Sequence, residues 1–460
     1  MNDKVELKRS IGLGTAVILV IANMIGTGVF TTSGFIIKDL ANPASMLLCW
    51  FIGGILALAG ALCYGELGAI FPKAGGEYVF LRESIGKPFG FLSGWVSLIV
   101  GFSAPIAAAS IAFSTYLYKS VAVESAGKEL LNISGIITIS PVTLTGISVI
   151  ILFSLIHWYS LNFGSRVQNL LTSFKILVIL VFIILGLFIG NGSINNFTSG
   201  PIQSSLFTGK FATSLIYISF AYSGWNAAAY IGSEIKNPSR NIPLSLFWGT
   251  MIVMFLYMML NVLFIYALPA SEMSGVVEVG AKAATGLFGA KTGTIFSTAI
   301  TICLMSVISA MILTGPRVYY AMANDNVFPR WFGDVNPRHT TPGKAIFLQA
   351  VIAIIMVLTS SFDRLLMYIG FTLSLFAMLT VIGLIILRAK NPGLERPYKT
   401  FGYPVTPALF ILSNLWIIAY SIKDNPTVLF YGGGTIVVGI LIYMYYSIKL
   451  KIQDSKFKIS

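Results

Sequence analysis

The sequence predicts an all-α integral membrane protein with twelve transmembrane helices. Of its 460 residues, 56% are hydrophobic and 10% are charged, and the mean hydropathy is +0.84. A soluble domain usually carries about 25% charged residues, so this chain cannot hide its apolar surface inside a water-exposed fold. Soluble enzymes, nucleic-acid-binding proteins and disordered scaffolds are therefore disfavoured, and a membrane protein is the starting hypothesis.

Twelve apolar runs carry this prediction, because a helix needs about 20 apolar residues to cross a bilayer. The first run is too long for the core of a signal peptide and no small-residue cleavage site follows it, so we expect it to be retained. The predicted spans cover residues 11–37, 43–70, 88–118, 141–162, 166–190, 206–232, 244–268, 292–323, 345–360, 365–387, 405–422 and 428–448.

The distribution of Lys and Arg predicts the orientation. With the N-terminus inside, 21 of the 30 basic residues fall on the cytoplasmic side, eight fall outside, and Lys175 lies within a span. Cytoplasmic loops of membrane proteins collect basic residues, so both termini, residues 1–10 and 449–460, are predicted to be cytoplasmic. The same asymmetry explains the net charge of +13 without a nucleic-acid partner.

No stretch between the spans is long enough to form a soluble domain. The longest polar stretches are 119–140, 269–291 and 324–344. Short amphipathic patterns in 269–291 and 77–85 fit either helices on the outer and inner faces or ordinary loops.

Two predicted spans are interrupted at matching places. The first contains IGTGVF (residues 25–30) and the sixth contains FAYSGWN (residues 220–226). Glycine costs about 1 kcal/mol inside a helix, and the neighbouring polar residues lower the cost of unwinding. Paired interruptions of this kind are typical of a transporter built from an inverted repeat. We therefore expect repeats at 11–190 and 206–388, followed by two additional helices at 405–448.

An unwound backbone in a membrane has free N–H and C=O groups that need partners. The half-helix after the first break presents N–H groups and a positive dipole end, which suit a carboxylate. The half-helices that end at the two breaks present carbonyls, which suit an ammonium group. Together these predict a site for a zwitterionic α-amino acid. The alternative is that Gly26 and Gly28 serve helix packing, as we expect for the stripe Gly53, Ala57, Ala61, Gly65 and Ala69.

Lys175 is the one basic residue expected near the bilayer midplane. It follows Arg166 by nine residues in the fifth span, which places it about 13–14 Å deep. A lysine there needs a partner inside the protein, and the carbonyl end of the broken first span is the natural candidate. At that place Lys175 would stand where a sodium-coupled transporter holds Na⁺, whereas snorkelling to the headgroups exceeds its reach of about 6 Å.

The other ionisable residues are less informative. Glu66, Glu234 and Arg317 lie near cytoplasmic span ends, where they form either a candidate inner gate or solvated helix ends. His157 is interpreted as a bystander. No metal-ligand cluster, hydrolase triad or phosphate-binding loop is recognisable, so we expect no metal, no cofactor and no ATP-driven step. Cys49, Cys63 and Cys303 lie in apolar runs, which disfavours disulfides.

With these motifs in place, the chain resembles the amino acid–polyamine–organocation (APC) superfamily, in the form seen in bacterial and archaeal permeases like the L-type amino acid transporters. IGTGVF resembles its first-helix signature and FAYSGWN its sixth-helix signature. Supporting stretches follow in family order: YGELG with PKAGGEY (64–68 and 72–78), EIKNP with RNIP (234–238 and 240–243), and GPRVYY leading to FP (315–320 and 328–329).

The resemblance implies a LeuT-type fold of five plus five helices that transports amino acids by alternating access. It also implies roles for residues of the two breaks and of spans five and eight. The backbone around Ile25, Gly26, Thr27 and Gly28 would hold the substrate carboxylate, and the backbone of Phe220, Ala221, Tyr222, Ser223 and Gly224 would hold the amino group. Phe220 would be the outer gate, Lys175 would mimic a sodium ion, and Ser306 and Ser309 would lie near it.

Three departures from the family pattern bear on the expected partner and substrate. The extracellular cysteine that bridges animal L-type transporters to a heavy chain is missing, so no such partner is expected. Ser223 stands where L-type members often have a smaller residue, which favours small substrates. No acidic residue lies in either break motif, which argues against a cationic substrate.

We therefore expect a secondary active transporter of small neutral L-amino acids in the plasma membrane, and not an enzyme. Proton symport and amino-acid exchange both remain open, as do the particular amino acid, the direction of transport and the choice between monomer and homo-oligomer. The alternatives are a polyamine or organic-cation transporter of the same fold, a non-transporting sensor, or a membrane-embedded enzyme.

Overall fold

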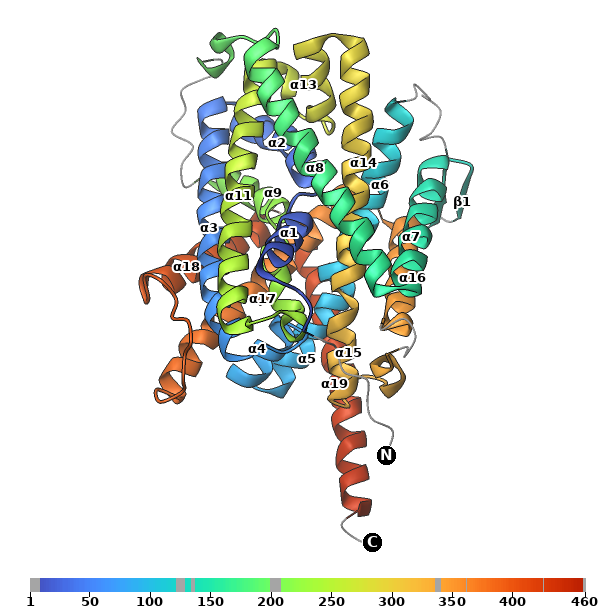
Figure 1. Ribbon diagram of the computed structural model, residues 1–460, viewed down its shortest axis with the longest axis vertical. Helices are drawn as coiled ribbons and strands as arrows, with labels where there is room; N and C mark the ends of the chain where they lie inside the picture. Colours follow the sequence, from blue (N-terminus) through green and yellow to red (C-terminus); the bar gives the residue numbers. More distant parts are fainter. Residues whose placement is uncertain are drawn as a thin grey trace.

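Helices make up nearly all the regular structure of the computed structural model, which describes residues 9–120, 129–133, 137–198, 208–335, 341–360, 362–424 and 426–457. Over these residues, nine helices are long and apolar enough to cross a membrane, and a bent pair of shorter helices makes a tenth. The chain is thus a nearly all-helical, multi-pass membrane protein. Most of the long helices run along the vertical axis of Figure 1.

The first part of the chain forms one broken helix, then a series of long helices. Its elements are α1 (Leu13–Met24), α2 (Gly28–Leu40), α3 (Pro43–Ile70), α4 (Glu77–Ser84), α5 (Lys87–Val96), the π-helix η1 (Ser97–Ser103), α6 (Ala104–Ser120), α7 (Pro141–Tyr159) and α8 (Leu161–Ile189). Strands β1 (Leu131–Ile133) and β2 (Ile137–Ile139) pair antiparallel within the predicted loop 119–140.

The second part begins with another broken helix. Its elements are the 3₁₀ turn η3 (Ile194–Thr198), α9 (Gly209–Ala221), α10 (Ala227–Tyr230), the 3₁₀ turn η4 (Gly232–Glu234), α11 (Pro238–Ala267), α12 (Ala270–Met273), α13 (Val279–Phe288), α14 (Ala290–Thr314), α15 (Pro316–Asn324), the 3₁₀ turn η5 (Arg330–Gly333), α16 (Gly343–Thr359), α17 (Phe362–Lys390), α18 (Val405–Asp424) and α19 (Thr427–Phe457).

Local sequence signals start several of these helices. Asn42 accepts a hydrogen bond from Ser45 N ahead of Pro43, and Ser140 with Thr143 forms a capping box ahead of Pro141. Proline at the first helical position needs no N–H partner, and a capping side chain satisfies one of the free donors. Helices α3 and α7 therefore begin at the predicted residues, whereas α8 and α11 begin before the predicted spans 166–190 and 244–268, at Leu161 and Pro238.

Some segments between the predicted spans are more ordered than simple loops. Stretch 269–291 contains α12 and α13, and stretch 77–85 contains α4. The predicted C-terminal tail continues as helix, since α19 extends to Phe457 and projects at the bottom of Figure 1. Residues 1–8 and 458–460 of the predicted termini lie outside the described residues.

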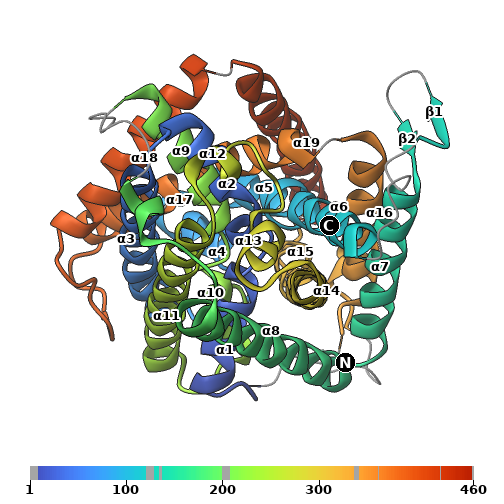
Figure 2. The same ribbon diagram turned by 90° about the horizontal axis from the view of Figure 1, so that it is seen from above.

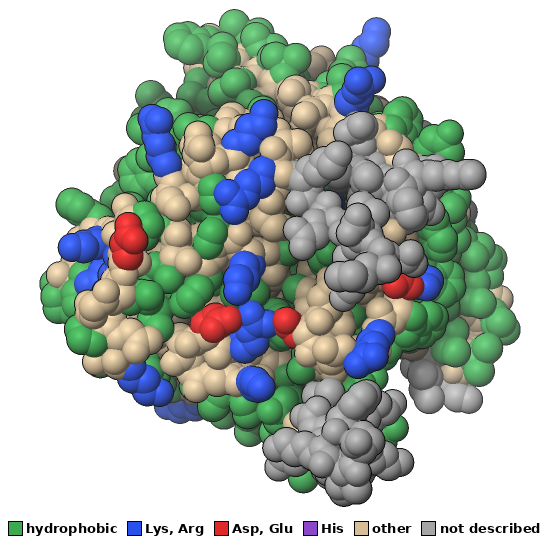
Figure 3. Space-filling view, turned by 60° about the horizontal axis from the view of Figure 1, so that its bottom comes forward, with side chains coloured by type: hydrophobic (Ala, Val, Ile, Leu, Met, Phe, Trp, Pro, Cys, Tyr) green, Lys and Arg blue, Asp and Glu red, His purple; other side chains and the backbone are tan. Residues whose placement is uncertain are grey.

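Several helices lie toward the middle of the bundle. Seen from above, α10, α13, α14 and α15 have α3, α18, α19, α16, α7 and α8 around them (Figure 2). The end of the molecule that carries α4, α5 and α15 displays Lys and Arg side chains across its face, with hydrophobic side chains around the rim (Figure 3). This face fits the basic side predicted from the loop charges.

The small-residue stripe of α3 allows close packing, as the sequence predicts. A Cβ atom added to Gly53 would lie 2.1 Å from Cγ2 of Ile218 in α9. At Gly65, an added Cβ would lie 3.3 Å from Cα of Pro243 in α11. The stripe therefore holds α3 against two different helices.

Replacing Gly53 by Val should destabilise the fold, because the extra methyls overlap Ile218. Overpacking of this kind costs about 1–3 kcal/mol, and thermal unfolding in detergent measures it as a lower melting temperature. Gly433→Val in α19 is the control, since an added Cβ there meets no atom within 4 Å. Equal melting temperatures for the two variants would contradict this account of the stripe.

Candidate functional site

The first interrupted helix breaks at residues 25–27. Helix α1 ends at Met24, α2 begins at Gly28, and the two axes differ in direction by 42°. Thr27 precedes the first turn of α2, so the free N–H groups of that turn lie at the break. Thr31 and Thr32 donate hydroxyl hydrogen bonds to the carbonyls of Thr27 and Gly28. The break therefore presents N–H donors on one side and the carbonyl end of α1 on the other.

The second interruption follows α9. The helix ends at Ala221, residues 222–226 form turns, and only the short α10 continues beyond them. Gly224 has φ +94°, a conformation that side-chain-bearing residues rarely adopt. The glycine of the second motif thus permits the turn that stops the helix.

The two breaks touch each other at their glycines. A Cβ atom on Gly28 would lie 2.5 Å from Cα of Ala221, and one on Gly224 would lie 2.7 Å from the carbonyl oxygen of Asn23. In both places backbone meets backbone, so no side-chain rotation could make room. Motifs almost 200 residues apart in the sequence are therefore joined into one site.

Two side chains satisfy carbonyls that the breaks leave free. Lys175 is fully buried, and its Nζ donates to Ala22 O at 3.0 Å and to Ile25 O at 2.6 Å. The structure thus has the lysine–carbonyl contact that the depth of Lys175 predicts. Tyr257 Oη lies 2.7 Å from Met24 O and 3.0 Å from Ala221 O, so it connects the two breaks.

Sequence reasoning missed Tyr257. It lies in α11, a long apolar helix whose sequence predicts a membrane span and nothing more. A signal was present, because Asn261 follows it by one helical turn and adds a second polar group to the same face. Asn261 accepts a hydrogen bond from Ser33 of α2 at 2.6 Å. The polar face of α11 therefore points at the broken first helix.

A cavity lies beside the breaks. It offers about 90 Å³ to the centres of water-sized molecules, several times the space one water needs. Four of the predicted substrate residues line it: Phe220, Tyr222, Ser223 and Gly224. From the first broken helix, Asn23 lines it. The remaining predicted residues do not line it: Ile25, Gly26, Thr27, Gly28 and Ala221.

Ser306 and Ser309 face helices α8 and α7. Ser306 Oγ lies 3.2 Å from Thr172 Oγ1 and 3.4 Å from Gln168 Nε2, one and two turns from Lys175 in α8. Ser309 Oγ lies 2.8 Å from Nε2 of the buried His157. Neither serine has a described hydrogen bond to Lys175: Ser306 lies beside polar residues of α8 that precede Lys175, and Ser309 contacts α7 instead.

The three residues of the candidate inner gate separate into two groups. Glu234 Oε1 and Arg317 Nε are 3.1 Å apart, and both side chains are 2% exposed. Near this pair, the backbone N–H groups of Ser10 and Ile11 donate to Glu234 O at 2.9 Å. This pair therefore joins the start of the chain, the end of the second broken helix and α15.

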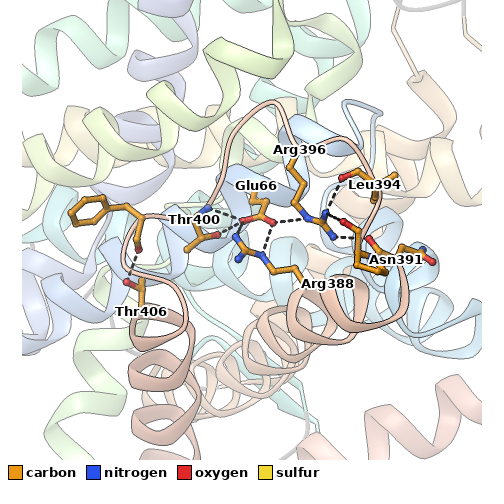
Figure 4. Close-up of polar contacts among 9 residues, drawn as sticks. Glu66, Arg388, Asn391, Leu394, Arg396, Thr400 and Thr406 are labelled. Carbon is orange, nitrogen blue, oxygen red and sulfur yellow. Dashed lines mark hydrogen bonds and ion pairs between the residues drawn. The ribbon is translucent and has the colours of Figure 1, made fainter.

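Glu66 belongs to another cluster, shown in Figure 4. Its carboxylate accepts hydrogen bonds from Arg388 Nε at 2.9 Å and from Thr400 N at 2.7 Å. Arg396 Nε lies 3.4 Å from the same carboxylate. These contacts fasten the linker between α17 and α18 to the inner end of α3. Glu66 is thus buried and paired, and it does not contact Glu234 or Arg317.

Sequence reasoning also missed Glu77 as a site residue. It is the first residue of α4, and it lines the cavity. Its Oε1 accepts hydrogen bonds from Tyr64 Oη at 2.6 Å and from Asn226 Nδ2 at 2.9 Å. Asn226 is the last residue of the FAYSGWN motif. An acid from a neighbouring helix therefore reaches the second break, although the break motif itself contains none.

The site is built for binding. Among the described residues, no three His, Cys, Asp or Glu side chains are grouped so that they could hold a metal ion. The cavity is lined by aromatic and aliphatic side chains, by hydroxyl and amide groups, and by the carboxyl group of Glu77. Broken helices that meet at a buried cavity within a multi-pass bundle define a membrane transporter of small molecules.

Comparison with known proteins identifies the family. Residues 11–448 match the amino acid permease family. The serine/threonine exchanger SteT of Bacillus subtilis is 31% identical over 448 residues, covering 96% of this chain and 97% of that protein. The large neutral amino acids transporter small subunit 2 of Homo sapiens is 27% identical, covering 95% and 80%. The human b(0,+)-type amino acid transporter 1 is 28% identical, covering 92% and 84%.

The chain belongs to the amino acid permease family of the APC superfamily. It is an amino acid transporter, and its relatives are permeases and transporters, not enzymes.

Gly224→Ala tests the contact between the two breaks. The positive φ alone costs about 1–2 kcal/mol in a residue with a side chain, and the methyl group also meets Asn23 O. We expect severe loss of amino acid uptake in proteoliposomes. Gly289→Ala is the matched control, because Gly289 has φ +80° but open space around an added Cβ. Similar losses in both variants would mean that backbone strain, and not the contact, is what matters.

Proposed function

We propose that the protein exchanges small neutral L-amino acids across the plasma membrane by alternating access. The observation that carries the proposal is the contact between the two broken helices beside a cavity. The serine/threonine exchanger of Bacillus subtilis, with 31% identity over nearly both full lengths, supports exchange and small substrates.

The proposed architecture has twelve transmembrane helices in the LeuT-type arrangement, with repeats at 11–190 and 206–388. The broken helix α9–α10 and the shorter apolar helix α16 supply the two spans beyond the ten already described. Cytoplasmic termini agree with the basic face in Figure 3. All three cysteines, Cys49, Cys63 and Cys303, are buried, and the proposed transporter has no disulfide-linked heavy chain.

The substrate would bind as a zwitterion. Its ammonium group would meet the carbonyl end of α9 at Phe220 and Ala221 and the turn at Ser223. Its carboxylate would meet the free N–H groups at the start of α2, near Thr27 and Gly28. The cavity reaches the second break directly and the first break through Asn23. The carboxylate would therefore bind as Gly28 and Ala221 separate, a movement that accompanies alternating access.

Two gates complete the proposed cycle. Phe220 lines the cavity and is only 7% exposed, which suits an aromatic outer gate. The buried Glu234–Arg317 pair suits an inner gate, since it joins the second broken helix to α15. Such a pair must separate for the cavity to open inward, and water entering the opened cavity would solvate both charges.

Glu77 also supports the alternative function, transport of a polyamine or another organic cation. A cavity-facing carboxylate could attract a polyamine or another organic cation. Competition between substrates distinguishes the two classes.

The exchange proposal predicts a specific uptake pattern. Proteoliposomes loaded with unlabelled serine should take up labelled alanine, and unloaded vesicles should not. Unlabelled small neutral amino acids should compete, whereas glutamate, lysine and putrescine should compete weakly. Uptake into empty vesicles driven by a proton gradient would indicate symport instead. Uptake of labelled putrescine would favour the organic-cation alternative.

Lys175→Met should greatly reduce exchange without preventing membrane insertion. Methionine keeps the length of the side chain but removes the donors that Ala22 O and Ile25 O accept. A hydrogen bond to a charged group contributes about 1.5–3 kcal/mol, so exchange should fall at least about tenfold. The exposed Lys282 provides the control variant Lys282→Met. Uptake at the wild-type rate in the Lys175 variant would remove this lysine from the mechanism.

A further inference from the structure

Glu77 is held against the second broken helix by the turn that precedes it. Gly75 and Gly76 have φ +116° and +52°, and Gly75 N donates to Tyr230 O at 3.0 Å. A Cβ atom on Gly76 would lie 2.5 Å from the ring of Tyr230. The start of α4 thus packs directly against α10, and the Glu77 side chain lines the cavity beside the break.

The carboxyl group of Glu77 is buried without a counter-charge. The side chain is 4% exposed, and both of its hydrogen bonds, from Tyr64 and Asn226, reach the same oxygen, Oε1. None of the ion pairs between described residues includes Glu77. A buried carboxylate with only neutral donors is costly, so this environment favours the protonated acid.

The groups facing Glu77 from the surrounding helices are neutral. Tyr64 comes from α3, Asn226 from the break and Tyr230 from α10. Beyond them, Thr380 of α17 faces Tyr64, and Ser97 of η1 faces Tyr230.

The charged residues of α4 point elsewhere. Arg82 pairs with Glu83 and with Asp325, close to the hydroxyl of Tyr78. Burial raises the pKa of the Glu77 carboxyl to about 7, although hydrogen bonds from Tyr64 and Asn226 lower it. The group therefore changes charge within the physiological range.

We propose that Glu77 is the proton-binding residue of the substrate cavity, and that its carboxyl group must be neutral for the cavity to close around an amino acid. The inference rests on the proposed function and adds a dependence on protons to it. The proton comes from water in the open cavity, binds the carboxylate, and returns to water when the cavity opens again. Ionisable groups inside transporters commonly act in this way.

The direction of the pH effect follows from the raised pKa. Buried as it is here, the Glu77 carboxyl binds its proton more tightly than it would in a water-filled cavity, where its ordinary pKa is 4.5. The proton's contribution to closure is therefore complete below about pH 4.5 and is lost as pH rises through about 7. Asn226 transmits the effect, because it connects Glu77 to the turn of the second break. In an exchange cycle the same proton is bound in both half-cycles, so pH sets the rate without a gradient driving accumulation.

The test is exchange of labelled alanine in serine-loaded proteoliposomes, with equal pH on both sides. The wild-type rate should fall roughly tenfold between about pH 6 and about pH 8, as a single group titrating near 7 requires. Glu77→Gln, which is permanently neutral, should exchange at a rate independent of pH. Glu83→Gln on the same helix is the control and should keep the wild-type profile, because Glu83 lies outside the cavity.

A measurement without substrate keeps the proposal testable if Glu77→Gln does not transport. Infrared difference spectra of the purified protein should show the carbonyl stretch of a protonated carboxylic acid that disappears as pH rises through about 7. That band should be missing from the Glu77→Gln spectrum. Its persistence in this variant would overturn the proposal, and so would a flat wild-type rate profile.

The outcomes separate this proposal from the exchange function. If the wild-type protein exchanges no amino acid at any pH, exchange fails, and the infrared band still decides whether Glu77 titrates. If labelled lysine is exchanged above about pH 8 and only Glu77→Gln abolishes it, Glu77 is an ionised counter-charge for cations. That result would overturn the proposed proton role.

Discussion

The backbone of a broken helix in a membrane must find partners for every N–H and C=O group that the break releases. This constraint explains why the centre of the molecule is built as it is. Lys175 and Tyr257 provide donors to the carbonyls of Ala22, Met24, Ile25 and Ala221. The N–H groups at the start of α2 face the place where the breaks meet. A substrate carboxylate would supply the acceptor that those groups need.

Close backbone contact makes the two breaks act together. Gly28 against Ala221, and Gly224 against Asn23, leave no space for side chains. A displacement of α2 relative to α9 therefore changes both halves of the site at once. Tyr257 couples that displacement to α11, because its hydroxyl is hydrogen-bonded to both breaks. Farther toward the basic face, the Glu234–Arg317 pair joins the same broken helix to α15. The Glu66 cluster, in contrast, fastens a linker to α3 and gives that helix a fixed inner end.

Much of this arrangement could be predicted from the sequence. The glycines of residues 25–30 and 220–226 mark both interruptions, and helical spacing gives the depth of Lys175. These features are local, so periodicity and residue type reveal them. The partners of Glu66, the bridging hydroxyl of Tyr257 and the approach of Glu77 to Asn226 depend on contacts across 36 to 334 residues. No local pattern encodes such pairings. The predicted trio of Glu66, Glu234 and Arg317 shares a membrane face, but packing divides it.

We propose that the two breaks together hold the charged ends of one amino acid. A cryo-electron microscopy structure with bound serine tests it most directly. We expect the carboxylate within hydrogen-bonding distance of the N–H groups at the start of α2, near Thr27 and Gly28. We expect the ammonium group beside the carbonyls of Phe220 and Ala221. Serine bound elsewhere in the cavity, with its carboxylate on a charged side chain and no contact to α2, would contradict it.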